Sequence, residues 1–125
     1  MQKKIYYHDT DAGGVVYYAN YLKFLEEART EFFAQRNISI KEFIEKGILF
    51  VVSRQEIDYK FPAFYADTLS IDTRVSKVGA ATIEFDYKIK NQRDRIVVEA
   101  RTILACVGNN FKPKAIPDEL RKWIS

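Results

Sequence analysis

The 125-residue sequence is poor in the residues that build disulfide frameworks, metal centres and histidine-dependent active sites. It contains one cysteine, Cys106, and one histidine, His8. A single cysteine excludes an internal disulfide and is typical of a reducing compartment. A single histidine excludes a metal centre built from several histidines, and its place in a loop does not favour a serine–histidine triad. We therefore expect no metal, an exposed His8 and a buried, apolar environment for Cys106.

Long apolar runs and dense positive clusters are also missing. No run approaches the roughly 18 apolar residues of a membrane span, and the first residues lack the apolar core of a signal peptide. The net charge of +3 is spread along the chain, which does not indicate nucleic acid but suits a small anionic ligand. With 47% hydrophobic residues, we expect one packed domain, residues 1–125, in the cytoplasm, with neither a transmembrane segment nor a nucleic-acid partner.

The first half of the sequence predicts a short strand, a loop and two helices. Residues 3–7 are β-prone and residues 8–14 form a loop. Apolar residues then recur at steps of three and four over residues 20–35, which predicts a long amphipathic helix. Ser39 followed by Glu42 has the spacing of a capping box, so a short helix is expected to about Lys46.

The second half predicts an antiparallel sheet. Residues 69–76 and 83–90 alternate between apolar and polar side chains, as strands with one buried face do. Residues 48–59 and 96–107 read as longer strands, and residues 118–124 as a terminal helical turn or two. The order predicts an α+β fold, with a curved five-stranded antiparallel sheet and the long helix on one face. Residues 103–107 are apolar on both faces, which favours cover by a partner subunit.

Two aspartates and a double glycine immediately precede the long helix. Asp9 and Asp11 lie just upstream of Gly13 and Gly14, and glycine permits a close approach of main chain to a ligand. A carboxylate beside a helix N-terminus has the chemistry to attack or deprotonate, while free N–H groups stabilise an oxyanion. Local sequence alone fits a turn role for Asp11 equally well, and a structural role for Asp9 better.

The segment that contains these residues resembles a known family. Residues 9–21, Asp-Thr-Asp-Ala-Gly-Gly-Val-Val-Tyr-Tyr-Ala-Asn-Tyr, are similar to the signature of hotdog-fold acyl-CoA thioesterases of the 4-hydroxybenzoyl-CoA thioesterase and YbgC type. The likeness continues to Glu31 and resumes at residues 58–63, 67–69 and 112–117. It therefore covers nearly the whole chain.

The resemblance implies a sheet wrapped around a central helix, subunits paired as a homodimer or homotetramer, and active sites at the subunit interface. It implies that Asp11 is the catalytic nucleophile or general base and that the backbone N–H of Tyr18 is the oxyanion donor. Tyr7, expected at a strand end, is a third candidate. YbgC-type members usually have histidine at the Tyr18 position and commonly glutamate at the His8 position. These two differences bear on which acyl-CoA is the substrate more than on the type of reaction.

The implied substrate is an acyl-CoA ester, so coenzyme A is part of the substrate and no separate cofactor is expected. Four basic residues are candidates for its phosphates: Arg54, Lys77, Lys112 and Lys114. Surface charge is the alternative for each of them. A non-catalytic acyl-group binding protein on the same fold is the alternative function. A hotdog dehydratase would need a histidine in the helix region, whereas His8 lies upstream of it.

Overall fold

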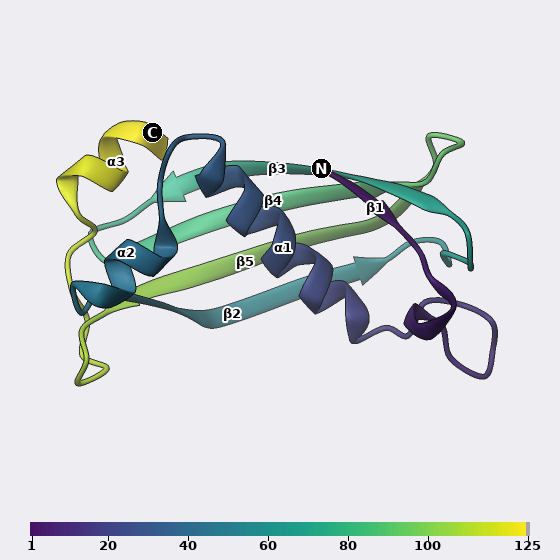
Figure 1. The fold of residues 1–125 in the computed structure, drawn as a ribbon, viewed down its shortest axis with the longest axis horizontal. Coiled ribbons are helices and arrows are strands. Elements are labelled where there is room, and N and C mark those ends of the chain that lie inside the picture. The colour runs from purple at the N-terminus through teal and green to yellow at the C-terminus, as the bar shows by residue number, and fades with distance from the viewer. Residues whose placement is uncertain (125) are drawn as a thin grey trace.

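Two layers, a curved sheet and a long helix across one face of it, form the described part of the chain (Figure 1). The computed structural model describes the backbone of residues 1–124 and the side chains of residues 1–122. Among these residues five strands pair antiparallel in the order β1-β3-β4-β5-β2. This confirms the predicted α+β architecture. The elements are β1 (Gln2–Lys4), the 3₁₀ turn η1 (Tyr7–Asp9), α1 (Asn20–Ala34), α2 (Ile40–Glu45), β2 (Leu49–Tyr59), β3 (Thr68–Val78), β4 (Thr82–Lys90), β5 (Ile96–Val107) and α3 (Asp118–Ile124).

The two predicted helices form where the sequence places their ends. Asn37 has φ 58°, and after this left-handed residue the N–H of Ile38 returns to the carbonyl of Phe33 at 3.0 Å. Such a contact closes the C-terminus of a helix. Ser39 caps α2, because its Oγ accepts the N–H of Glu42 at 3.3 Å. The buried face of α1 is the predicted one: Tyr21, Phe24, Leu25, Ala28, Phe32 and Phe33.

The core lies between α1 and the facing side of the sheet. Phe85, in the middle of β4, is fully buried and its ring meets those of Phe32 and Phe33 edge-on, each at 5.6 Å between centroids. Edge-to-face pairs of this kind add to the apolar burial. Truncating such a side chain costs about 3–5 kcal/mol, so this cluster holds the helix against the sheet.

The bulges in β2 and β3 each carry a serine. The register shifts at Ser53 in β2 and at Ser76 in β3. The hydroxyl of Ser53 donates to the carbonyl of Ile103 at 3.1 Å, and that of Ser76 to the carbonyl of Glu84 at 3.3 Å. A bulge bends its strand, and the hydroxyls compensate the disturbed ladder. The bend lets the sheet wrap around α1.

The N-terminal strand is shorter than the sequence predicts. β1 stops at Lys4, and Tyr7 begins η1 instead of ending a strand. The reason is local: the N–H of Tyr6 donates to Asp9 Oδ2 at 2.9 Å, and the N–H of Asp9 donates to the carbonyl of Tyr6 at 3.0 Å. These two bonds close a turn at the point where the strand would have continued.

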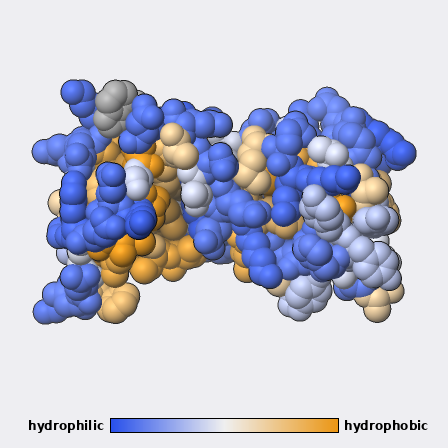
Figure 2. Space-filling model, in the orientation of Figure 1, coloured by the Kyte–Doolittle hydropathy of each residue, from blue (hydrophilic) through white to orange (hydrophobic). Residues whose placement is uncertain are grey.

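The edge strand β2 is poorly covered. All eleven of its residues are described, and none is buried in the single chain. At the predicted two-sided apolar end of β5, Leu104 and Cys106 are buried whereas Ile103 and Ala105 are half-buried. Apolar residues also reach the surface on the helix-bearing side, most broadly toward the end that carries α2 and α3 (Figure 2).

Candidate active site

A turn from Asp11 to Gly14 presents the predicted catalytic carboxylate. Asp11 Oδ1 accepts the N–H of Gly13 at 2.8 Å, and the carbonyl of Asp11 accepts the N–H of Gly14 at 3.0 Å. Gly14 has φ 79°, a conformation that favours glycine, and a Cβ on Gly13 would lie 3.2 Å from Asp11 Oδ1. The side chain is exposed, and its Oδ2 has no hydrogen-bond partner among the described residues. One carboxylate oxygen is thus fixed and the other is available.

The turn is tied to the segment that follows β2. The N–H of Asp11 donates to the carbonyl of Val15 at 2.9 Å, and the N–H of Val16 donates to the carbonyl of Ala63 at 2.8 Å. Val15 also forms a bridge with Phe64. Backbone bonds of this kind pin both ends of a loop, so the Asp11 carboxylate projects from a defined position at one end of the sheet.

Asp9 connects this turn to the start of α1. Its side chain is 6% exposed and accepts the N–H of Tyr6. Its carbonyl accepts the N–H of Tyr17 at 3.0 Å and Nδ2 of Asn20 at 2.9 Å. The expected structural role of Asp9 agrees with these bonds. Asn20 does not cap the helix, because it is the first helical residue and its side chain bonds the carbonyl of Asp9 instead.

The helix start presents free main-chain donors toward solvent. The carbonyl of Tyr17 accepts the N–H of Asn20 at 2.9 Å, and the carbonyl of Tyr18 accepts the hydroxyl of Tyr59 at 3.1 Å. The backbone N–H of Tyr18 has no hydrogen-bond partner in the part of the chain that the structure describes. It lies next to the positive end of the α1 dipole. This N–H is the donor that the sequence predicts for an oxyanion.

Tyr17 and Tyr18 pack together just before α1. Their rings lie 4.9 Å apart, and Tyr18 is 61% exposed. The Tyr18 hydroxyl raises the pKa of Tyr17 most, followed by desolvation and, as the smallest cause, by the Asp11 charge. Asp11 and Tyr17 therefore lie at the same end of the molecule. A carboxylate and a free N–H group are the two elements that hydrolysis of a carbonyl substrate needs.

Tyr7 lies outside this arrangement. Its side chain is 78% exposed and its ring meets Tyr65 edge-on at 5.9 Å. The expectation that Tyr7 ends a strand was wrong, and the main chain of Tyr7 serves η1 by accepting Thr10 Oγ1 at 2.7 Å. Tyr21 is instead the buried tyrosine near the helix start. Burial raises its pKa to about 12, although the Ala63 backbone N–H acts in the opposite direction.

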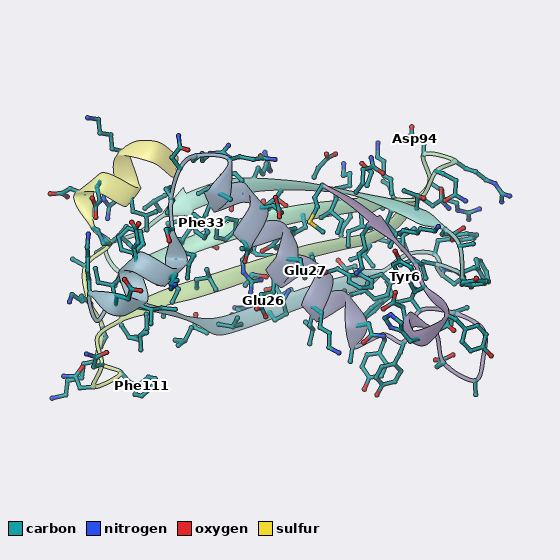
Figure 3. The ribbon with its side chains drawn as sticks, viewed as in Figure 1. Tyr6, Glu26, Glu27, Phe33, Asp94 and Phe111 are labelled. Atoms are coloured by element: carbon teal, nitrogen blue, oxygen red, sulfur yellow. The ribbon has the colours of Figure 1, made fainter. Side chains whose placement is uncertain are left out.

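The four basic candidates lie away from Asp11 within one chain. Lys112 and Lys114 follow β5, whose end pairs with the start of β2, whereas the Asp11 turn contacts the segment after β2. An eleven-residue strand of roughly 36 Å separates the two ends. Figure 3 shows Phe111, in the loop after β5, and Tyr6 at opposite ends of the molecule.

Arg54 and Lys77 are likewise on the sheet and not at the Asp11 turn. Arg54 lies in the middle of β2 and pairs with Glu56 at 2.7 Å, and Lys77 lies near the end of β3 opposite Glu84. Lys46, Lys112 and Lys114 line a groove of about 600 Å³ beside Gly108. One chain therefore gathers Asp11 and Tyr18, but does not bring these basic residues to them.

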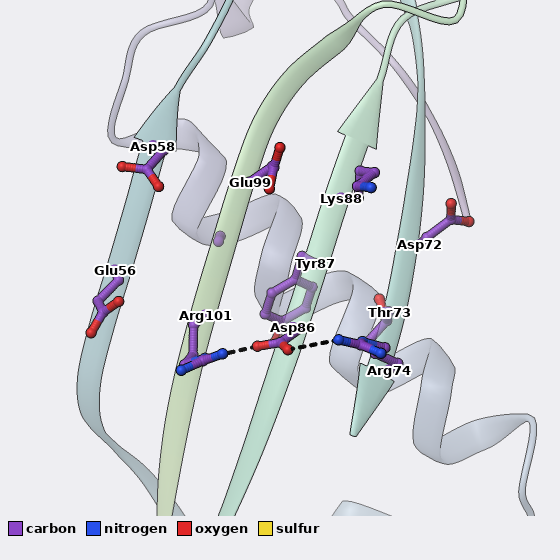
Figure 4. Close-up of a pocket in the computed structure, with 11 residues that line it drawn as sticks. Glu56, Asp58, Asp72, Thr73, Arg74, Asp86, Tyr87, Lys88, Glu99 and Arg101 are labelled. Atoms are coloured by element: carbon purple, nitrogen blue, oxygen red, sulfur yellow. Dashed lines mark hydrogen bonds and ion pairs between the residues drawn. The ribbon is translucent and has the colours of Figure 1, made fainter. Parts of the chain in front are cut away.

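A second groove, of about 660 Å³, crosses the outer face of the sheet and holds none of the predicted site residues. Charged side chains line it, and one of them is paired on both sides: Asp86 Oδ1 accepts Arg101 Nε at 2.9 Å and Asp86 Oδ2 accepts an Arg74 nitrogen at 3.3 Å (Figure 4). A groove lined by charges is unsuited to an acyl chain, because the charges would be desolvated.

The described residues contain no group of three or more histidine, cysteine, aspartate or glutamate side chains that could hold a metal ion. None of the described helices is long and apolar enough to cross a membrane. The His8 side chain is exposed and its ring stacks on Tyr6. Cys106 is buried, as predicted, and burial raises the pKa of its thiol.

Comparison with known proteins identifies the family. Residues 6–124 match the family model described as the Thioesterase-like superfamily. The chain is 41% identical over 121 residues to the acyl-CoA thioesterase YbgC of Haemophilus influenzae, covering 94% of this chain and 88% of that protein. It is 35% identical over 118 residues to the acyl-CoA thioester hydrolase YbgC of Escherichia coli O6:H1, with the same coverage.

A solved structure shows the same fold. The 1,4-dihydroxy-2-naphthoyl-CoA thioesterase Slr0204 of Synechocystis superposes with a TM-score of 0.93 at 24% identity, covering 99% of this chain and 93% of that one. The fold is therefore the hotdog fold of thioesterases, as the sequence resemblance implied. The chain belongs to the Thioesterase-like superfamily. It is an enzyme of the thioesterase class.

Sequence reasoning did not single out Tyr59 or the side-chain role of Asn20. Both act on main chain distant in sequence: Tyr59 on Tyr18 and Asn20 on Asp9. Tyr59 is the last residue of β2, just before Phe61-Pro62. The Phe61-Pro62 break indicated that the strand ends there, but the packing of Tyr59 against the helix start depends on the tertiary fold.

Proposed function

We propose that the protein hydrolyses acyl-CoA thioesters to a free acid and coenzyme A, with Asp11 as the nucleophile or general base. The observation that carries this is the Asp11 carboxylate, with one oxygen held by Gly13 and the other free, in a turn bonded to a helix start with an unpaired Tyr18 N–H. The names of the YbgC relatives support the acyl-CoA substrate.

The geometry is compatible with two routes. In the first, the free oxygen of Asp11 attacks the thioester carbonyl carbon, the C–S bond breaks, the thiolate takes a proton from solvent, and water opens the resulting anhydride to free acid and Asp11. In the second, Asp11 takes a proton from water as the water attacks the carbonyl carbon, and the C–S bond then breaks while the leaving thiolate receives that proton from Asp11. In both, charge develops on the carbonyl oxygen, and the N–H of Tyr18 stabilises it. Such a donor contributes about 3–4 kcal/mol. Neither route needs a separate cofactor.

A panel of acyl-CoA esters, short and long aliphatic as well as aromatic, in a thiol-release assay tests the proposal. At least one ester should be hydrolysed well above the uncatalysed rate. Binding of acyl-CoA without hydrolysis of any ester would instead favour the alternative, a non-catalytic acyl-group binding protein. The panel also defines the acyl preference. Tyr7, which is exposed beside Tyr65, remains a proposed contact for the substrate. Comparison of a Tyr7→Phe variant with the parent in the same assay tests this contact.

The active unit is proposed to be a homodimer or homotetramer in which the site is shared between chains. Support comes from β2, an edge strand with no buried residue among its eleven. Its apolar residues Leu49, Phe50, Val51 and Ile57 are only half-buried. An uncovered, partly apolar edge favours pairing with another strand.

A two-fold pairing of β2 with a second copy would also bring the basic residues to Asp11. In an antiparallel pair the start of one β2 lies beside the end of the other. The loop with Lys112 and Lys114, which follows the strand partner of the β2 start, would then approach the partner's Asp11 turn. On this proposal Lys112, Lys114, Lys77 and Arg54 are candidates to meet the coenzyme A phosphates from the neighbouring chain.

Light scattering at micromolar concentration should give a mass at least twice 14.6 kDa. A clean monomer with full activity would contradict the shared site. We further propose that residues 1–125 act as one domain in the cytoplasm, which the single buried Cys106 supports.

A further inference from the structure

Both peptide units that flank Tyr18 are anchored through their carbonyls. The Tyr17 carbonyl accepts the N–H of Asn20 and the Tyr18 carbonyl accepts the hydroxyl of Tyr59. The described residues contain no cis peptide bond, and in a trans unit C=O and N–H point in opposite directions. The Tyr17 carbonyl points toward Asn20, so the Tyr18 N–H of the same peptide unit points away from the helix. The bond to the Tyr18 carbonyl fixes the next peptide unit, between Tyr18 and Ala19.

The two anchors come from different parts of the molecule. Asn20 belongs to the same helix start, whereas Tyr59 is 41 residues away in sequence, at the end of β2. The Tyr59 ring is itself positioned by edge-on contacts with Tyr18 at 6.3 Å and Tyr21 at 5.7 Å. Burial, and then the neighbouring Tyr18, raise the pKa of Tyr59 above its ordinary value of 10.0. Its hydroxyl is therefore protonated, and available as a donor, at neutral pH.

We propose that Tyr59 is a positioning residue for thioester hydrolysis: by holding the Tyr18 carbonyl, its hydroxyl keeps the Tyr18 N–H directed at the substrate oxygen. The inference rests on the proposed function. Donors aimed in advance at a developing charge need no reorganisation during the reaction. Without the Tyr59 bond, the peptide unit after Tyr18 loses its anchor, and the unit that carries the Tyr18 N–H is held by the Asn20 bond alone, so the direction of the N–H is less tightly fixed.

Tyr59→Phe tests this because it removes the hydroxyl and keeps the ring. We expect kcat to fall by about 3- to 10-fold, the effect of one net hydrogen bond. KM should stay within about twofold, because the loss falls on the transition state. Affinity for a non-hydrolysable ketone analogue of the best acyl-CoA should likewise be unchanged. Melting temperature and mass are measured first, so that rates refer to folded protein.

Tyr6→Phe is the matched control. Tyr6 is at the same end of the molecule and 51% exposed, and its hydroxyl has no hydrogen-bond partner among the described residues. It should retain the parent kcat. Three results would overturn the role of Tyr59 and leave the proposed function intact. Tyr59→Phe could keep the parent kcat, it could raise KM at an unchanged kcat, or Tyr59→Phe and Tyr6→Phe could lose kcat equally. A parent protein that hydrolyses no acyl-CoA would refute both.

Discussion

Asp11 and Asp86 are carboxylates of one chain in opposite situations. Both oxygens of Asp86 are taken, one by Arg101 and the other by Arg74. The hydrogen bond from Arg101 is the main cause that holds the pKa of Asp86 below its ordinary value, although partial burial opposes it. The Asp11 carboxylate has a single partner, the N–H of Gly13, and no arginine is bonded to it among the described residues.

The difference favours Asp11 over Asp86 as the reactive carboxylate of the proposed function, although Asp86 lies in a wide groove that is rich in ionisable groups. A carboxylate held by two guanidinium groups is stabilised as an anion and has no free oxygen with which to attack or accept a proton. Asp11 keeps one free carboxylate oxygen, and the Tyr18 N–H at the helix start is also without a partner among the described residues. The proposed site is thus distinguished by polar groups that the fold of a single chain leaves without partners.

Asp11→Asn should give the largest effect and tests one side of this comparison. Asparagine keeps an oxygen for the Gly13 N–H but is a poor nucleophile and base, so kcat should fall by at least about 100-fold. Substrate affinity and melting temperature should change little. Thiol release per folded molecule is the measurement. A normally folded variant that works at the parent rate would show that Asp11 is not the catalytic carboxylate.

Asp9→Ala should act through stability instead. It leaves the N–H of Tyr6 without its acceptor, which costs about 1–3 kcal/mol and lowers the melting temperature by several degrees. Asp9→Asn keeps an oxygen and should lose less. Activity per folded molecule should exceed that of Asp11→Asn. If Asp9→Ala were stable and equally inactive, the catalytic role would move to Asp9.

Raising the ionic strength should weaken coenzyme A binding, by less than Asp11→Asn lowers kcat. If basic residues meet its phosphates, affinity should fall about 3- to 10-fold between roughly 0.01 and 0.3 M salt. Lys112→Gln combined with Lys114→Gln should flatten this dependence. Lys88→Gln, in the outer groove, is the control and should leave it unchanged. Calorimetric titration with coenzyme A measures the affinity of the parent, the double lysine variant and Lys88→Gln at each salt concentration. A parent affinity that does not change with salt would exclude the ionic contribution.

Asp86→Asn should give the smallest effect. We expect the melting temperature to fall by about 3 °C with activity retained. The lowered pKa sets the sign: the stabilisation is complete above the unfolded pKa near 3.8 and is lost as pH falls through the lower folded value. Melting curves of parent and variant should therefore differ at pH 6 and converge toward pH 3. A gap that widens in acid would contradict this.

The fold and the turn from Asp11 to Gly14 were predictable from sequence because their signals are local. The α1 periodicity, the Ser39 cap and the Gly13-Gly14 pair each act within a few residues. The end of β1 and the contact of Tyr59 were not predictable. The first depends on the side chain of Asp9, five residues beyond the strand, and the second joins elements far apart in sequence.

The carbonyl of Asp9, which accepts both the Tyr17 N–H and the Asn20 side chain, has a consequence for how such an enzyme changes over evolution. It joins the Asp11 turn and the start of α1 into one local unit, which is anchored to the rest of the chain at the end of β2 and just after it, through Tyr59 and Ala63. Mutations elsewhere in the sheet can then reshape the space for an acyl group while these contacts are kept. The chain and the Synechocystis thioesterase share a fold at 24% identity, the divergence that such modularity permits.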